Sequence, residues 1–90
     1  MSAKIQAQEG LQFIEAAILQ LLGERAYGLT NNEISVELGL ESDQGGKQKN
    51  YLAWSVLGIL MKKNKVSRTS HQRPGENAKR EIYKLVSSAE

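Results

Sequence analysis

The chain has 90 residues, of which 40% are hydrophobic and 24% are charged, and its formal net charge is +2. These values fit one small folded domain over residues 1–90 and exclude a disordered segment or a second core. No apolar run approaches the ~20 residues that span a bilayer, and the polar N-terminus does not resemble a signal peptide, so we expect a cytoplasmic protein without membrane contact. The chain has no cysteine and only one histidine, His71, so we expect neither a metal nor a cofactor.

The charges are distributed unevenly along the chain. Residues 1–46 contain two basic and seven acidic side chains, whereas residues 47–84 contain ten basic and two acidic ones. Such sign asymmetry indicates that the second half attracts a polyanion. Neutralisation of one half by the other in the folded domain is the alternative.

Two helices are predicted in the acidic half. Apolar residues recur at helical spacing from Glu9 to Arg25, whereas residues 1–8 and 87–90 lack a periodic pattern and are expected to be frayed ends. Thr30 and Glu33 have the spacing of a capping box, so a second helix is predicted to start there and to stop at Gly39. A short strand between these two helices is possible.

A third helix is predicted from about Lys47 to Asn64, after a glycine-rich loop over residues 41–46. At 100° per residue, one side of this helix is apolar and is expected to pack in the core: Leu52, Ala53, Val56, Leu57, Ile59 and Leu60. The outward side contains Lys47, Tyr51, Trp54, Ser55, Gly58 and Lys62. Asn64 suits the left-handed conformation that ends many helices.

Residues 66–70 and 79–86 are predicted strands, because β-branched and aromatic residues are frequent there. Pro74-Gly75 between them is a turn signal. The end of the chain is therefore predicted to be a basic β-hairpin.

This order of elements resembles a winged helix-turn-helix domain, of class α+β. The local similarities are TNNEISVELGL over residues 30–40, LGILMKKNKVSR over residues 57–68, and the closing EIYKL. The segment around residues 41–48 is longer than a compact form of the motif needs. It either lengthens the turn before the third helix or adds turns to the start of that helix.

The resemblance implies binding to double-stranded DNA, with the third helix in the major groove and the hairpin as a wing on the backbone or in the minor groove. The implied recognition-helix contacts are Lys47, Gln48, Lys49, Asn50, Tyr51 and Ser55. The implied wing contacts are Arg68, Ser70, His71, Gln72, Arg73, Lys79 and Arg80. Amides such as Gln48 and Asn50 are the better candidates for base contact, because lysines often contact only phosphates. A solvated helix start and a loop without ligand are the structural alternatives.

Trp54 has three possible neighbours: DNA, the hairpin of the same chain, or a second subunit. We favour packing, with Trp54 and Gly58 as the seat of the hairpin, because glycine permits close approach of a backbone. The broad apolar arc of the first helix, which includes Phe13, indicates a possible homodimer.

An enzyme is not expected, because the sequence shows no activated nucleophile, paired carboxylates or phosphate-binding motif. The predicted function is DNA binding, as a small bacterial-type transcriptional regulator or as the recognition module of a larger system. A winged-helix adaptor that binds proteins is the alternative.

Overall fold

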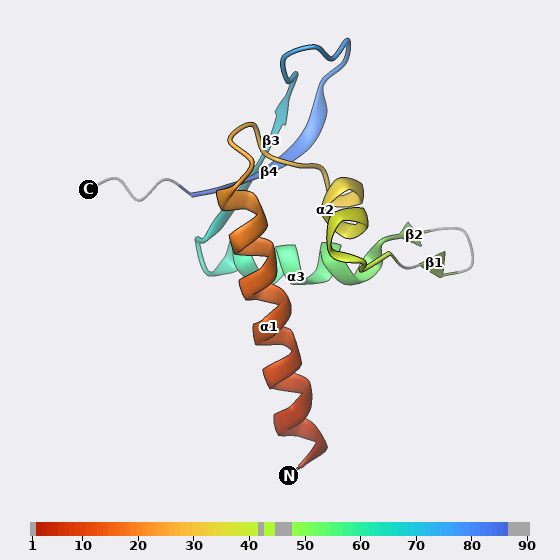
Figure 1. Ribbon diagram of the computed structural model, residues 1–90, viewed down its shortest axis with the longest axis vertical. Coiled ribbons are helices and arrows are strands. Elements are labelled where there is room, and N and C mark those ends of the chain that lie inside the picture. The colour runs from red at the N-terminus through yellow and green to blue at the C-terminus, as the bar shows by residue number, and fades with distance from the viewer. Residues whose placement is uncertain (1, 42, 45–47, 87–90) are drawn as a thin grey trace.

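The computed structural model describes residues 2–41, 43–44 and 48–86, with the backbone alone at 43–44 and 48–49. Three helices precede a two-stranded antiparallel hairpin, so the class is α+β and the layout is that of a winged helix (Figure 1). The elements are α1 (Ala3–Gly23), α2 (Asn31–Leu38), β1 (Asp43–Gln44), β2 (Gln48–Lys49), α3 (Tyr51–Lys62), β3 (Val66–His71) and β4 (Arg80–Leu85). None of the helices in the described ranges has the length and apolar character needed to cross a membrane.

Helix α1 begins at Ala3, earlier than the predicted start at Glu9, so the segment expected to be frayed is helical from Ala3 onward. The Ser2 side chain caps it by accepting a hydrogen bond of 3.1 Å from the Ile5 amide. Residues 2–9 are exposed, and the buried side chains of α1 all lie from Glu15 onward. Apolar periodicity detects only the packed half, whereas the other half projects from the body (Figure 1). The other predicted frayed end, 87–90, lies outside the described residues.

Helix α2 is bounded by the predicted signals. The Glu33 amide donates to Thr30 Oγ1 over 3.1 Å, and the Thr30 amide donates to Glu33 Oε1 over 2.9 Å, which confirms the capping box. Gly39 ends the helix in the left-handed region, with φ of 68°.

Helix α3 begins at Tyr51 and not near Lys47. Strands β1 and β2 pair antiparallel before it, where the sequence predicted a loop followed by helix. Asn50 separates β2 from α3 with a left-handed φ of 60°, which a helix interior does not accommodate. Gln48 and Lys49 have little intrinsic preference for strand, so nothing in this segment signals the extra hairpin.

The C-terminal end of α3 is as predicted. Asn64 has a φ of 61°, its amide donates to the Met61 carbonyl, and the Lys65 amide donates to the Leu60 carbonyl. This pair of bonds is a Schellman motif, which satisfies carbonyls at the helix end. It also turns the chain into β3.

The apolar side of α3 joins a core that α1, α2 and the hairpin complete. Its fully buried members include Ile18 of α1, Ile34 of α2, and Val56, Leu57 and Leu60 of α3. Ala53 is also buried and Ile59 partly so, as predicted, but Leu52 is exposed because it lies in the first turn, at the edge of this core.

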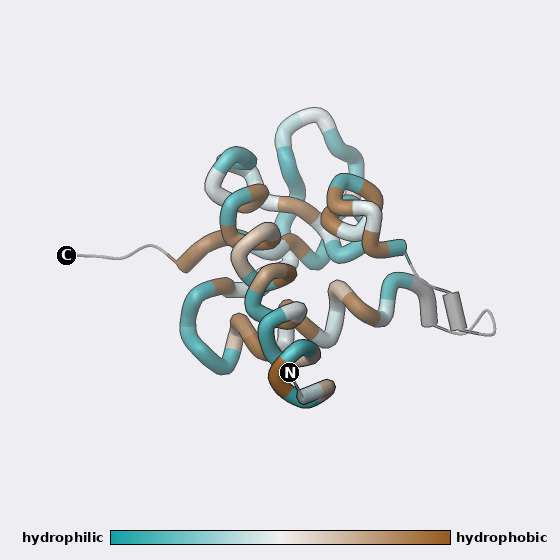
Figure 2. The backbone as a smooth tube through the Cα atoms, turned by 60° about the horizontal axis from the view of Figure 1, so that its bottom comes forward, coloured by the Kyte–Doolittle hydropathy of each residue, from teal (hydrophilic) through white to brown (hydrophobic). Residues whose placement is uncertain are grey.

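Strands β3 and β4 pair in register from Val66 with Leu85 to His71 with Arg80. Leu29, between α1 and α2, forms a single-residue antiparallel bridge with Tyr83 of β4. The Leu29 amide donates to the Tyr83 carbonyl over 3.1 Å, and the Tyr83 amide donates to the Leu29 carbonyl over 2.8 Å. This confirms the possible short strand. The outer part of the hairpin is mostly hydrophilic (Figure 2), so only its base packs in the core.

Candidate nucleic-acid interface

A groove of about 440 Å³ lies where the start of α2, the outward side of α3 and the hairpin meet. Asn31 and Asn32 contribute from α2, Trp54 from α3, and Arg68, Arg80, Glu81 and Tyr83 from the hairpin. The structure thus brings two predicted wing contacts, Arg68 and Arg80, to a common surface with Trp54, for which packing is the favoured prediction. We call this surface the Trp54 groove.

Trp54 is 49% exposed although it lines this groove. Its ring centroid lies 6.2 Å from that of Tyr51 one turn earlier, with the planes inclined by 37°. The predicted role of Gly58 is wrong, since a Cβ added there meets no described atom within 4 Å. The hairpin therefore does not pack closely on Gly58, and about half of Trp54 stays open to solvent.

Arg68 and Arg80 are exposed on the hairpin. Arg68 Nε lies 3.6 Å from Glu81 Oε1, and Arg80 Nε lies 3.5 Å from Glu76 Oε2. Both separations exceed an ordinary hydrogen bond, and exposed ion pairs of this kind contribute little to stability. Both guanidinium groups retain Nη donors without a partner in the described part of the chain, and these can bind an anion.

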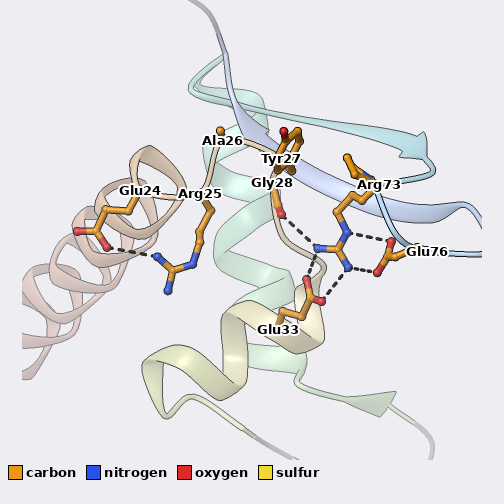
Figure 3. A pocket seen from close by; sticks show the side chains of 9 residues that line it. Glu24, Arg25, Ala26, Tyr27, Gly28, Glu33, Arg73 and Glu76 are labelled. Carbon is orange, nitrogen blue, oxygen red and sulfur yellow. Dashed lines mark hydrogen bonds and ion pairs between the residues drawn. The ribbon is translucent and has the colours of Figure 1, made fainter.

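Arg73, a predicted DNA contact, has a structural role instead. Its side chain is only 11% exposed, and its guanidinium lies between Glu33 at the start of α2 and Glu76 of the hairpin (Figure 3). It donates to Glu33 over 2.7 and 2.8 Å, to Glu76 over 3.0 and 2.5 Å, and to the Gly28 carbonyl over 3.2 Å. All five guanidinium N–H groups are thereby used, which leaves none for a phosphate. We call this cluster the Arg73 latch.

The latch shifts the ionisation of its members. Hydrogen bonds from Arg73 lower the pKa of Glu33 to about 2. Hydrogen bonds from the same guanidinium lower the pKa of Glu76, and bonding to both carboxylates raises the pKa of Arg73. The latch is therefore fully charged at neutral pH and ties the hairpin tip to α2.

Asn50, a predicted base contact, is buried at the junction of α2 and α3. Its Nδ2 donates to Asn32 Oδ1 over 2.6 Å, and its carbonyl accepts from Asn31 Nδ2 over 3.2 Å. Burial and these bonds make Asn50 a joint between the two helices, and its side chain is not available for the predicted base contact.

The remaining predicted contacts divide into three groups. Four of them are exposed to solvent: Tyr51 on α3, and Ser70, His71 and Lys79 at the hairpin. Ser55 is half-buried. Gln72 is also exposed, but its side chain donates to the Glu76 carbonyl over 2.7 Å. Gln48 and Lys49 lie on β2 and not on α3. Lys47 lies outside the described residues.

Sequence reasoning missed the Arg73 latch and the asparagine joint, because both connect residues far apart in the chain. The capping box correctly placed Glu33 at a helix start, but only one of its oxygens is needed there. No periodic signal shows that a hairpin arginine binds the same carboxylate. Within the described ranges, no group of three or more potential metal ligands lies together.

Comparisons with protein-family models, with curated proteins and with solved structures returned no match to this chain.

Proposed function

We propose that the protein binds double-stranded DNA through the outward side of α3 and the hairpin, which acts as a wing. The observation that carries this proposal is the Trp54 groove, where exposed Arg68 and Arg80 lie beside the start of α3. An α-helix fits the major groove of DNA, and flanking arginines bind phosphates. The proposed role is that of a small regulator of transcription or of the recognition module of a larger system.

The charge of the hairpin supports this proposal. Residues 66–86 contain five basic and two acidic side chains, and Lys62, Lys63 and Lys65 precede them. Even with Arg73 held by two carboxylates, this end of the domain remains basic. Binding should therefore weaken steeply as salt rises, because each neutralised phosphate releases counterions.

The test is a gel-shift titration of a mixed-sequence duplex at two salt concentrations. We expect the double variant Arg68→Ala/Arg80→Ala to bind more weakly and to lower the slope of log K against log salt by about 2, since two phosphate contacts are lost. Lys4→Ala is the matched control, because it removes a basic side chain from the exposed N-terminal half of α1. Equal losses in both proteins, or an unchanged slope, would contradict the proposal.

A homodimer through α1 is a second proposal, supported by exposed apolar side chains on that helix. Phe13 is 75% exposed, and Ile5 and Leu11 are exposed on the same projecting half. A projecting half-helix is marginally stable alone and is stabilised by an apolar partner. The adaptor alternative would instead use the exposed side of α3 around Trp54.

Sedimentation at several protein concentrations tests this second proposal. We expect a dimer that Phe13→Asp converts to a monomer, whereas Val36→Asp on α2 leaves the dimer intact. Val36 is a fair control because it is also a large exposed apolar side chain. A monomer of the unmodified chain at high concentration would refute dimerisation and leave the DNA proposal in place.

A further inference from the structure

Trp54 is only partly covered, and it lies beside arginine and asparagine side chains of the kind that bind nucleotides. The indole lies at the Trp54 groove, and the ring of Tyr51, which is not among the residues that line the groove, has its centroid 6.2 Å from that of Trp54. Both side chains are about half exposed. An exposed tryptophan exposes a large apolar area, which a ligand with a flat π-surface covers well. Every nucleobase has such a surface.

The hairpin side of the groove carries two arginines, Arg68 and Arg80, and one carboxylate, Glu81. Arg68 and Arg80 project from β3 and β4, and each closest carboxylate lies beyond 3.4 Å, at the Nε atom. Guanidinium groups bind phosphate through paired donors, which here are the Nη groups. The groove therefore combines an aromatic wall for a base with donors for the phosphate that accompanies it.

A third feature is a fixed amide at the groove. Asn50 Nδ2 donates to Asn32 Oδ1 over 2.6 Å, so the orientation of the exposed Asn32 amide is set and its Nδ2 donors are directed away from this bond. Asn32 Nδ2 makes no other hydrogen bond within the described ranges. It can donate to the N7, N3 or carbonyl acceptors on the edge of a base.

We infer that the Trp54 groove binds one unpaired nucleobase, which stacks on Trp54 while Arg68 and Arg80 hold the adjoining phosphate. In an intact duplex the bases are stacked on one another and their faces are closed to side chains, so an indole can cover a base only where pairing is lost. The preferred ligand is then DNA with a bulged, flipped or single-stranded nucleotide. This inference rests on the proposal that DNA is the ligand.

The experiment compares two duplexes of the same sequence, one of which has a single-nucleotide bulge. Trp54 is the only tryptophan of the chain, so its emission reports on stacking directly. We expect the bulged duplex to bind about tenfold more tightly, as one base–aromatic stack allows, and to quench Trp54 emission more than the intact duplex does. The titration uses the unmodified chain and so depends on no variant.

Two variants then assign the preference, with affinities measured from the anisotropy of labelled DNA. Trp54→Leu should remove the preference, so that the bulged and the intact duplex bind with equal affinity. Tyr27→Leu should keep the preference, because Tyr27 is an exposed aromatic outside this groove. Equal affinities and equal emission with both duplexes would overturn the inference and leave DNA binding standing. No binding of either duplex at low salt would overturn both.

Discussion

Replacement of Arg73 by methionine tests the structural role of the latch. Methionine keeps an unbranched apolar stem but removes all five donors to Glu33, Glu76 and the Gly28 carbonyl. The two carboxylates then lie near each other without a cation between them. We expect the free energy of unfolding to fall and the hairpin tip to separate from α2.

The size of the effect follows from the pKa of Glu33. A fall of the pKa from 4.5 to about 2 corresponds to roughly 3.5 kcal/mol at about 1.4 kcal/mol per unit. The Glu33 side chain is 37% exposed, so solvent screening reduces this contribution to about 1–2 kcal/mol. We therefore expect Arg73→Met to lower stability at pH 7 by about 2 kcal/mol, between the ranges for exposed and buried ion pairs.

The same reasoning gives a pH dependence. Because the pKa of Glu33 is lower in the folded than in the unfolded state, its contribution is fully present above about pH 4.5 and is lost as the pH falls towards 2. The difference in stability between the unmodified chain and Arg73→Met should therefore shrink over this range.

Urea unfolding at several pH values, followed by circular dichroism, measures both quantities. Arg80→Met is the matched control, because Arg80 contacts the same Glu76 carboxylate but is 56% exposed, and it should cost less than about 1 kcal/mol. A cost for Arg73→Met equal to that of the control, or a difference that stays constant down to pH 2, would refute the latch.

Four further substitutions test the fold that positions the groove. Gly28→Ala should destabilise the domain by more than about 2 kcal/mol in urea unfolding, because Gly28 has a φ of 78° and an added Cβ would lie 2.8 Å from the Tyr83 carbonyl oxygen. Gly39→Ala is the control: Gly39 has a φ of 68°, but an added Cβ meets no described atom within 4 Å, so the substitution should cost about 1 kcal/mol. A cost at Gly28 no greater than at Gly39 would contradict this packing. Asn50→Ala should lower stability by about 2 kcal/mol, because it removes the hydrogen bond to Asn32 and places alanine at a left-handed φ. Asn50→Gly should cost less, because glycine tolerates that conformation. A larger cost for glycine than for alanine would contradict this explanation.

The elements that the sequence predicts well are those with local signals. The capping box at Thr30, the left-handed Gly39 and Asn64, and the frequent β-branched and aromatic residues of the hairpin strands are all signals that act over a few positions. Helix α2, the end of α3 and the C-terminal hairpin are therefore predictable from neighbouring residues alone.

The start of α3 and the roles of the charged residues are not predictable in this way. Asn50 takes a left-handed conformation where Asn31 and Asn32 bond to it, and those partners lie 18 and 19 positions away. Arg73 bonds to Glu33 from 40 positions away. Asparagine and arginine are both residue types that often contact DNA, so the sequence alone indicates a DNA contact at each position. Only the fold shows that their side chains are bonded within the domain.

The location of the interface is tested most directly by adding a duplex to the ¹⁵N-labelled chain and recording amide shifts by NMR at low salt. DNA binding through the proposed surface predicts changes at the start of α3 and along β3 and β4, around Trp54, Arg68 and Arg80. Changes confined to the projecting half of α1, or the absence of any change, would contradict it.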